Sequence, residues 1–217
     1  MDKLYTTLLF DLDGTLTDPK LGITRSVQYA LNKFGIHIDR LDALIPFIGP
    51  PLLESFQVFY GFEPEKSREA VAYYREYFQQ TGIYENAIFP EIPALLTELQ
   101  SRGKSLLVAT SKPTVFAEEV CRHFHIDHFF RFIAGSNLDG SRTVKAEVIA
   151  YALEHAPRFQ RHQVLMIGDR KHDIIGAAHH QIDSLAVTYG YGSRQELADA
   201  QPTYIVDSVA GIAQIVK

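Results

Sequence analysis

Residues 8–18 read Leu-Leu-Phe-Asp-Leu-Asp-Gly-Thr-Leu-Thr-Asp, an apolar run that leads into two aspartates, Asp11 and Asp13, and then Gly14. A short apolar run is typical of a strand buried on both faces. Carboxylates directly after such a strand lie at the mouth of a parallel sheet, where open α/β folds bind ligands. Gly14 permits a tight turn that directs backbone N–H groups toward an anion. Asp-Gly is also a common turn dipeptide, so this stretch alone fits a plain acidic turn equally well.

The length and composition of the chain are those of an ordinary globular protein. Its 217 residues suffice for one large domain, or for one domain with an insertion. Apolar residues make up 46% and charged residues 22%, which is typical of soluble domains. The formal net charge of −5 does not favour a nucleic-acid polymer or an anionic membrane as a partner.

Sequence signals for export, membrane insertion or disulfide bonding are not evident. Residues 1–5, Met-Asp-Lys-Leu-Tyr, lack the basic and apolar regions of a signal peptide. No run approaches the roughly 18 apolar residues of a membrane-spanning helix. The single cysteine, Cys121, excludes an internal disulfide framework and a cysteine-built metal site, and its apolar neighbours predict a core position. We therefore expect a cytoplasmic protein.

From Phe89 onward, strand-like runs alternate with helix-like stretches. Strands are predicted at residues 105–109, 130–134, 163–167, 183–188 and 204–206, and helices at 93–99, 114–124, 144–155, 173–180 and 209–216. Such alternation implies right-handed crossovers and a parallel sheet covered by helices on both faces. Together with the strand at the start of the chain, it predicts an α/β fold, a three-layer Rossmann-like core.

Between the first strand and this region the pattern is helical. Ile23, Val27 and Leu31 recur at helical spacing, and further helix-like stretches follow up to Gly82. We therefore expect an α/β core that is split in sequence by an inserted helical domain. The core would comprise residues 1–17 and 85–217, and the insertion residues 18–84.

Two later strands of the core also end in polar residues. Thr110 and Ser111 follow one of them, and hydroxyls ahead of a helix N-terminus suit a bound phosphate. Asp169 follows the other, with Asp173 four residues later, and such hard oxygen ligands suit Mg²⁺. Each motif alone has a structural explanation, because Ser, Thr and Asp also cap helices and form turns.

The three strand ends carry more information together, because parallel strands bring their carboxyl ends to one edge of the sheet. Four aspartates at this edge, Asp11, Asp13, Asp169 and Asp173, would repel one another unless a cation holds them, which predicts a Mg²⁺ site. Lys145, at the start of a predicted helix, would supply the positive charge that a phosphate and a carboxylate nucleophile both need. Alone, Lys145 would be an ordinary surface lysine.

The motifs resemble those of the haloacid dehalogenase superfamily of phosphatases. Asp11–Thr17 is similar to the first motif of that family, Thr110 to the hydroxyl of the second, Lys145 to its lysine, and Gly168–Asp173 to its last motif. They occur in the family's order and cover nearly the whole chain, and the first is the most specific. The resemblance implies a phosphatase with a Mg²⁺ cofactor and a small phosphorylated metabolite as its substrate. We expect a monomer or a homodimer.

The resemblance also implies catalytic roles for two residues of the first motif. Asp11 would attack phosphorus and form an aspartyl-phosphate. Asp13 would protonate the leaving oxygen and then activate the hydrolytic water, while its backbone carbonyl helps to hold Mg²⁺.

The remaining motifs would bind the phosphate and the metal. Thr110 and Lys145 would bind phosphate oxygens. Asp169 would ligate Mg²⁺, and Asp173 would ligate the ion or orient its waters. With Asp11 and Asp13, these two aspartates complete the predicted metal set.

The insertion resembles the helical cap of the phosphoglycolate phosphatase-like branch, which implies a lid that closes over the core site and selects the substrate. Gly49 and Pro50 are the cap residues expected to face the substrate, with a plain interhelical turn as the alternative. Gly14, Ser111 and Arg142 are the substrate-binding candidates of the core. Four other basic residues are weaker candidates, each explained equally well as exposed charge: Arg25, Lys112, Lys171 and His172.

Two segments favour the 5′-nucleotidase-like subgroup of this branch. Residues 135–142, ahead of Lys145, and residues 168–173 are similar to its third and fourth motifs. Nucleoside 5′-monophosphates are therefore the favoured substrates. The alternatives are phosphoglycolate, or a broad range of phosphomonoesters that includes phosphotyrosine.

Other functions on the same scaffold are less favoured. A phosphosugar mutase would share the core motifs, so only the products distinguish it. A non-catalytic phosphometabolite-binding module would be expected to lack Asp11, Asp13 or Lys145. A dehalogenase needs no metal and no acid two residues after its nucleophile, and a phosphonate-cleaving relative needs a cap lysine in a recognisable context.

Overall fold

The computed structural model describes residues 4–216 and divides the chain into two compact units. One unit combines the chain up to Thr17 with the chain from Ile88 onward, and the other contains Asp18–Ala87. The chain passes between them in two short strands, β2 (Thr17–Asp18) and β3 (Ala87–Ile88), which pair with each other.

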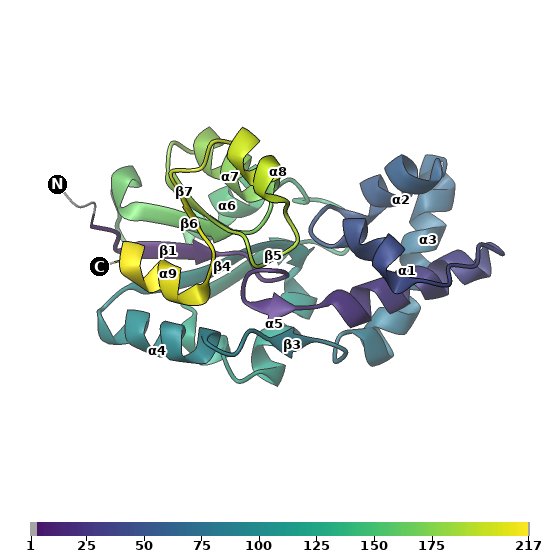
Figure 1. Cartoon of the computed structure of the whole chain (residues 1–217), viewed down its shortest axis with the longest axis horizontal. Helices are drawn as coiled ribbons and strands as arrows, with labels where there is room; N and C mark the ends of the chain where they lie inside the picture. The colour runs from purple at the N-terminus through teal and green to yellow at the C-terminus, as the bar shows by residue number, and fades with distance from the viewer. Residues whose placement is uncertain (1–3, 217) are drawn as a thin grey trace. The chain divides into compact units, whose positions relative to one another are not determined.

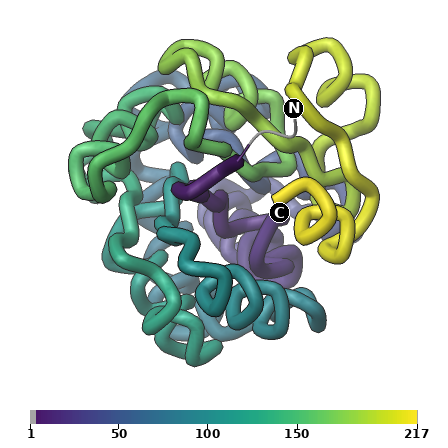
Figure 2. Tube along the Cα trace, turned by 90° about the vertical axis from the view of Figure 1, so that its left-hand side faces the viewer, coloured from purple at the N-terminus to yellow at the C-terminus, as the bar shows by residue number. Residues whose placement is uncertain are grey.

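The first unit is built on a six-stranded parallel sheet in the order β5-β4-β1-β6-β7-β8. Its strands are β1 (Thr7–Phe10), β4 (Ser105–Pro113), β5 (Phe132–Ser136), β6 (Val164–Gly168), β7 (Asp183–Val187) and β8 (Tyr204–Val206). In Figure 2 the purple trace of β1 lies in the middle of this unit. The central place of β1 follows from its apolar sequence, because a parallel strand with neighbours on both sides is buried on both faces.

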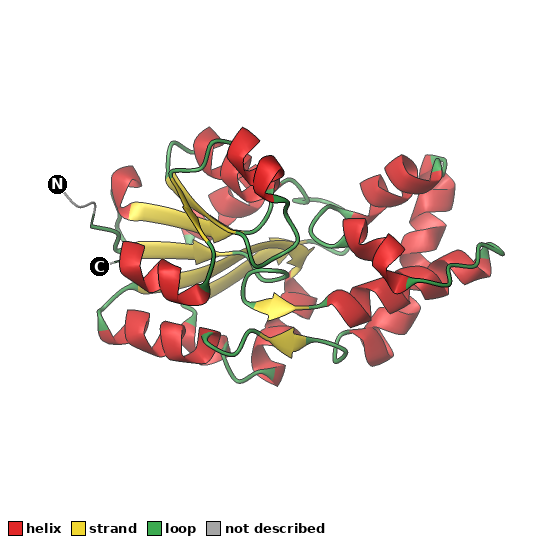
Figure 3. Ribbon diagram, in the orientation of Figure 1, coloured by secondary structure: helices red, strands yellow, loops and turns green. Residues whose placement is uncertain are grey.

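Helices cover both faces of this sheet (Figures 1 and 3). They are α4 (Ile92–Ser101), α5 (Thr114–His123), α6 (Lys145–Glu154), α7 (Lys171–His179), α8 (Arg194–Asp199) and α9 (Val209–Ile215), with single turns η3 (Asp127–Phe129) and η4 (Arg161–Gln163). Helices α6 and α7 pack together on one face, and α4, α5 and α9 lie on the other. The predicted α/β, three-layer core with a parallel sheet is therefore confirmed.

The core between the sheet and helices α6 and α7 follows from the register of the strands. Leu9 of β1 pairs with Leu107 of β4 and Met166 of β6. These side chains form one buried cluster with Val148 and Ile149 of α6. Leu8 and Phe10 alternate to the opposite face, as the two-residue period of a strand requires. Cys121 is also fully buried, as predicted.

The second unit is helical and has an aromatic core. Its elements are α1 (Lys20–Lys33), η1 (Leu41–Phe47), α2 (Leu52–Tyr60), α3 (Pro64–Tyr77) and the π-helical turn η2 (Phe78–Gly82). Phe47, Phe56 and Phe62 contact one another through their rings, with centroids 5.0 and 6.0 Å apart. Gly22 lies so close to η2 that a Cβ would fall 1.9 Å from the Gly82 carbonyl oxygen, so only glycine fits there.

Several elements differ from the sequence prediction, and the differences at β4 and α8 have clear physical causes. Strand β4 continues to Pro113, although the apolar run ends at Ala109, because Pro113 still pairs with Ser136 of β5. Helix α8 was not predicted, because its sequence has no apolar residues at helical spacing. Its start is fixed by Ser193, whose Oγ accepts the Glu196 N–H at 3.0 Å. Within residues 4–216, no helix combines the length and hydropathy needed to cross a bilayer.

Candidate functional site at the carboxyl edge of the sheet

The order of the strands brings three polar strand ends together. β1 lies between β4 and β6, so the residues after Phe10 are flanked by those at the ends of both neighbours. The chain connections on the two sides of β1 run in opposite directions from the sheet centre, which is the arrangement at which open α/β sheets bind ligands. Asp11, Thr110 and Asp169 accordingly lie at one edge of the sheet, and all three are buried.

Three of the four predicted metal ligands form a tight acidic cluster. One carboxylate oxygen from each of Asp11, Asp169 and Asp173 lies within 4.8 Å of the other two. Asp11 Oδ1 accepts the Leu12 N–H at 2.8 Å. Asp173 Oδ2 accepts the Arg170 N–H at 3.1 Å. Burial raises the pKa of Asp173 to about 6, against the opposing effect of Lys145 and with a further rise from Asp11.

Asp169 is held by the loops that follow β1 and β7. Thr15 Oγ1 donates to Asp169 Oδ1 at 3.3 Å, and the Tyr191 N–H donates to Oδ2 at 2.7 Å. Gly14, at φ +86°, makes room for this carboxylate, since a Cβ there would fall 2.3 Å from Asp169 Oδ2. Burial raises the pKa of Asp169 well above its ordinary value, and the neighbouring carboxylates add to the rise.

Lys145, the first residue of α6, ties two members of the cluster together. Its Nζ lies 3.0 Å from Asp11 Oδ1, 2.8 Å from Asp173 Oδ1 and 3.0 Å from the Ala109 carbonyl oxygen, to which it donates. Burial lowers the pKa of this ammonium, but the two carboxylates outweigh that effect and leave the pKa above its ordinary value. Lys145 is therefore a permanent positive charge inside the cluster.

The carboxylate of Asp13 points to a different cation. Both of its oxygens accept hydrogen bonds from Lys112 Nζ, at 2.7 and 2.5 Å. Burial raises the pKa of Asp13, and Lys112 opposes this rise. The side chain of Asp13 is thus separate from the cluster of Asp11, Asp169 and Asp173, and a role in metal binding is left to its backbone carbonyl.

The charges at this edge favour a bound cation. The four buried aspartates face two buried lysines, Lys112 and Lys145, so carboxyl groups outnumber ammonium groups. Within residues 4–216, Asp173 Oδ1 is also a buried oxygen with an ion-pair contact to Lys145 Nζ at 2.8 Å but with no donor in hydrogen-bond geometry. A hard divalent ion would neutralise the excess charge and use such an oxygen as a ligand. The donor set therefore fits Mg²⁺.

Several predicted substrate-binding residues have partners within the core unit. The hydroxyl oxygen of Thr110 accepts the Lys112 N–H at 3.3 Å, and the Ser111 carbonyl accepts the Ser136 hydroxyl at 2.8 Å. The guanidinium of Arg142 donates to the Gly135 carbonyl and to Asn137 Oδ1, both at 2.8 Å. Arg142 thus braces the loop before α6.

The predicted glycines and the proline lie in turns. The Gly14 N–H donates to the Thr17 carbonyl at 2.7 Å, so in this structure it closes the turn after β1. Gly49 and Pro50 belong to the second unit, in the turn between η1 and α2, where Gly49 has φ +105°. What they contribute to substrate binding stays a prediction.

Sequence reasoning missed two parts of the site. From the sequence, Lys112 is a weaker candidate for substrate contact with exposed charge as the alternative, whereas the structure buries it against Asp13. No sequence signal indicated this position, because the predicted strand ends at Ala109 and Lys112 lies beyond it. The loop at residues 188–192, Thr-Tyr-Gly-Tyr-Gly, holds Asp169, and a glycine-rich turn after a predicted strand was its signal.

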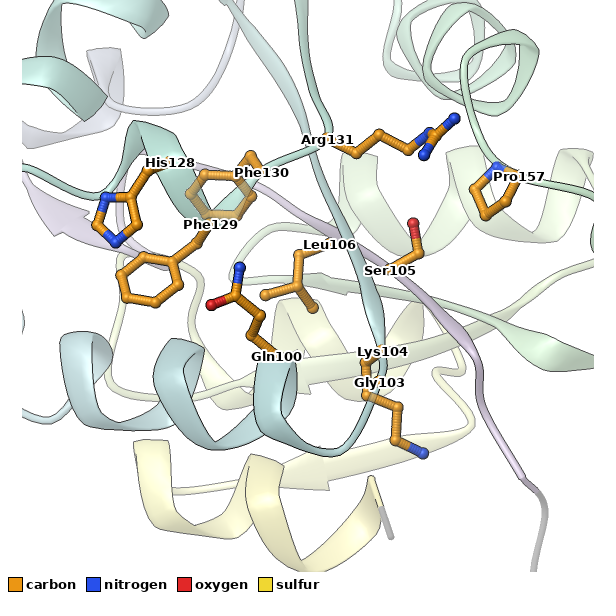
Figure 4. Close-up of a pocket in the computed structure, with 10 residues that line it drawn as sticks. All are labelled: Gln100, Gly103, Lys104, Ser105, Leu106, His128, Phe129, Phe130, Arg131 and Pro157. Carbon is orange, nitrogen blue, oxygen red and sulfur yellow. The ribbon is translucent and has the colours of Figure 1, made fainter.

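The opposite end of the sheet carries a surface hollow of about 440 Å³. It is lined by Gln100, Gly103, Lys104, Ser105, Leu106, His128, Phe129, Phe130, Arg131 and Pro157. Lys104 and Arg131 extend in opposite directions in Figure 4, and Arg131 Nε donates to the His155 carbonyl. The charged groups of this hollow therefore do not converge on a ligand.

Comparison with known proteins agrees with the site described above. Residues 8–187 match the family model of haloacid dehalogenase-like hydrolases. The chain is 50% identical to a protein of Pseudomonas aeruginosa named 5′-nucleotidase, over 98% of this chain and 96% of that protein. It is 39% identical to the tyrosine-protein kinase PtkA of Mycobacterium tuberculosis, over 96% of this chain and 70% of the relative.

Among solved structures, a predicted phosphatase from Clostridium acetobutylicum superimposes with a TM-score of 0.94 at 47% identity, over 97% of both chains. The matched span of the family model includes Asp11, Asp13, Thr110, Lys145 and Asp169, so the family match extends over the part of this chain that builds the carboxyl edge.

Proposed function

We propose that this chain, which belongs to the haloacid dehalogenase-like hydrolase family, hydrolyses small phosphomonoesters through an aspartyl-phosphate formed on Asp11, with Mg²⁺ as its metal ion. The family resemblance of the motifs is confirmed, and the chain is a phosphatase of that family. The observation that carries the proposed mechanism is the buried carboxylate of Asp11 beside a permanent ammonium and two further carboxylates.

The first half-reaction uses Asp11 as nucleophile. Lys145 and the Leu12 N–H both contact Oδ1 and fix the carboxylate, and no residue within 4–216 donates a hydrogen bond to Oδ2. An Asp11 oxygen forms a bond to phosphorus while the bond from phosphorus to the leaving oxygen breaks. Asp13 gives its proton to that oxygen, and the phosphate oxygens lie against the Thr110 hydroxyl and within the field of Lys145.

The second half-reaction returns Asp11 to its starting state. A water molecule attacks phosphorus, the bond to Asp11 breaks, and Asp13, now ionised, takes the proton of the water. Burial raises the pKa of Asp13, and Lys112 opposes this rise. This balance suits a group that acts first as an acid and then as a base.

The metal ion would be held by Asp11, Asp169 and Asp173, with the backbone carbonyl of Asp13. When bound, Mg²⁺ supplies positive charge that lets an anionic phosphate approach an anionic carboxylate. Thr15 and Tyr191 orient Asp169 for this role, and Gly14 leaves it the space.

Nucleoside 5′-monophosphates are the proposed substrate class. The sequence of residues 135–142 and 168–173 and the 50% identity to a protein named 5′-nucleotidase support this choice. The identity to PtkA favours a second candidate, in which the phosphoryl group passes between ATP and a tyrosine hydroxyl. Both candidates would use the same aspartate, so the acceptor and the donor have to be tested.

A screen of phosphate release tests the proposed function. The screen ranks four kinds of substrate by kcat/KM in the presence of Mg²⁺: nucleoside monophosphates, phosphoglycolate, sugar phosphates and phosphotyrosine. Incubation with ATP and a tyrosine peptide tests for kinase activity. Formation of an isomerised sugar phosphate tests for mutase activity. We expect AMP or a related monophosphate to rank first. Asp11→Asn should reduce phosphate release by at least about a thousandfold, because it removes the nucleophile. A variant rate near that of the wild type would disprove the role of Asp11.

We also propose that Asp18–Ala87 selects the substrate as a cap, with Gly49 and Pro50 among its contacts. Pro50→Ala should change the ratio of kcat/KM between AMP and phosphoglycolate while leaving the thermal midpoint close to that of the wild type. An unchanged ratio would leave the turn at these residues as a structural connection.

A further inference from the structure

A buried ion pair, Lys112 with Asp13, adjoins the acidic cluster, and the mechanism above gives Asp13 the proton transfer but gives Lys112 no role beyond its charge. Lys112 Nζ donates to both oxygens of Asp13, and the two side chains are only 5% and 11% exposed. A charged group is retained in a protein interior only where it is paired and hydrogen-bonded. The burial of Lys112 therefore depends on Asp13, and the orientation of Asp13 depends on Lys112.

Strand β4 brings Lys112 to this position. Thr110 and Lys112 are two residues apart and both buried, while Ser111 between them is half-buried, as expected when alternate side chains share a face. The pairing of β4 with β5 changes register between Ala109 and Pro113. One strand end therefore presents both the hydroxyl proposed for phosphate and the ammonium that holds Asp13.

The two buried lysines divide the carboxylates between them. Lys145 contacts Asp11 and Asp173, whereas Lys112 contacts Asp13 through both oxygens. Two hydrogen bonds to one carboxylate restrict its rotation more than a single bond does. Proton transfer requires the acid to lie within hydrogen-bond reach of the leaving oxygen, so a restricted orientation of Asp13 bears directly on the rate.

We propose that Lys112 is a positioning residue for Asp13, and that it fixes the carboxyl group in the orientation from which a proton passes to the leaving oxygen as the bond to phosphorus breaks. This rests on the proposed function. Loss of Lys112 should therefore slow the hydrolysis of some esters more than that of others, because an alkyl leaving group needs that proton, whereas 4-nitrophenolate departs without it. A lysine that served only phosphate binding or folding would affect both classes of ester alike.

The test measures kcat/KM of Lys112→Met on an alkyl phosphate and on 4-nitrophenyl phosphate, because kcat/KM reports the steps up to departure of the leaving group. The alkyl phosphate is whichever of AMP, phosphoglycolate and ribose 5-phosphate the wild type hydrolyses fastest. We expect a loss of about 100-fold on the alkyl phosphate and a several-fold smaller loss on 4-nitrophenyl phosphate. Lys112→Arg, which keeps the cation, should regain most of the difference.

Two comparisons separate this role from a general effect of losing a lysine. Lys104→Met is the matched control, since Lys104 Nζ donates to the Tyr5 carbonyl at 2.8 Å before β4 begins, and it should leave the ratio of the two substrates unchanged. Asp13→Asn should show the selective loss, and adding Lys112→Met to it should cause no further loss, because Lys112 acts through Asp13.

Equal losses on both esters, or a further loss in the double variant, would overturn the proposal. If Lys112→Met alone does not fold, the comparison of Asp13→Asn with the double variant still decides, because the double variant leaves no member of the pair charged. A wild type that releases phosphate from none of the four esters would instead disprove the proposed function.

Discussion

The two ends of the parallel sheet differ in how their polar groups are paired. At the amino end, Tyr5 Oη donates to Asp183 Oδ2 at 2.7 Å, and the Thr203 hydroxyl donates to Asp183 Oδ1 at 3.2 Å. Each oxygen of this carboxylate has a neutral donor, and the Tyr204 ring packs edge-on against Tyr5. At the carboxyl end, buried aspartates outnumber buried lysines, and among the described residues Asp173 Oδ1 has an ion pair with Lys145 but no hydrogen-bond donor.

This difference between the two ends indicates that one end of the sheet serves stability and the other serves function. A satisfied polar group stabilises the folded state modestly, whereas uncompensated buried charge destabilises it unless a ligand is bound. The polar groups of the amino end are therefore stable without a ligand, whereas the carboxyl end requires a bound cation to compensate its charge. Perturbations of the two ends should therefore differ in kind: at one end they should affect ligand binding and turnover, and at the other only the free energy of unfolding.

Removal of the metal should produce the largest effect. EDTA should abolish phosphate release and added Mg²⁺ should restore it, because the excess negative charge of the carboxyl end would then repel the phosphate. At a concentration 100 times its dissociation constant, Mg²⁺ should also stabilise the protein by about 2.7 kcal/mol. Thermal unfolding with and without Mg²⁺ measures this, with Asp169→Asn as the comparison.

Asp169→Asn keeps the size of the side chain but removes one charge of the cluster. The variant should show little stabilisation by Mg²⁺ over the same range of concentrations. Full activity of the wild type in EDTA, or equal stabilisation of both proteins, would contradict the metal assignment and remove the contrast between the two ends.

Replacement of Lys145 should widen the imbalance of charge. Lys145→Met leaves Asp11 and Asp173 without their shared cation, so kcat/KM should fall by about 10²- to 10³-fold. Breaking a buried ion pair also leaves charge uncompensated, and the metal-free variant should lose about 3 kcal/mol of unfolding free energy. Steady-state kinetics and urea unfolding test the two effects, and an unchanged rate would mean that Lys145 is not part of the site.

Much of the carboxyl end could be predicted because its functional residues directly follow apolar runs in the sequence. Asp11 and Asp13 follow one buried strand and Asp169 another, and parallel pairing alone requires them to meet at one edge. The amino end carried no comparable motif. Tyr5 and Asp183 are far apart in sequence, and only the strand order brings them together.

What could not be predicted depended on where a strand ends and on which partner a polar atom selects. The burial of Lys112 depends on β4 continuing beyond its apolar run, which is decided by pairing with β5. Gly14 predicts a tight turn, but the partner of its own N–H, the Thr17 carbonyl, follows from the closed turn and not from the sequence. Such choices are made by tertiary hydrogen bonds, which no local pattern of residues encodes.

The pH dependence of stability should distinguish the ends further. In the metal-free protein burial raises the pKa of Asp173 to about 6, above its ordinary value of 3.8. The folded state therefore holds a proton that the unfolded chain releases, so the stabilising contribution is complete below pH 3.8 and is lost as the pH rises through about 6. This group should account for about 3 kcal/mol of that decline.

Urea unfolding of metal-free wild type and Asp173→Asn between pH 4 and 7 measures this contribution. The variant lacks the titrating group, so the difference between the two proteins should change across this range, and Mg²⁺ at pH 7 should stabilise the wild type. Parallel curves for the two proteins would show that Asp173 titrates normally.

The smallest effect is expected at the amino end. Burial raises the pKa of the Tyr5 hydroxyl, as do its bonds to Tyr204 and Asp183, so the group stays protonated and donates to Asp183. Tyr5→Phe removes this donor but keeps the ring, and should cost about 1 to 2 kcal/mol of unfolding free energy. Because Asp183 keeps the Thr203 hydroxyl as a donor, no metal requirement should appear, and kcat/KM and the response to Mg²⁺ should match the wild type. A loss of turnover without loss of stability would show that the two ends of the sheet are coupled, and that the carboxyl end does not act alone.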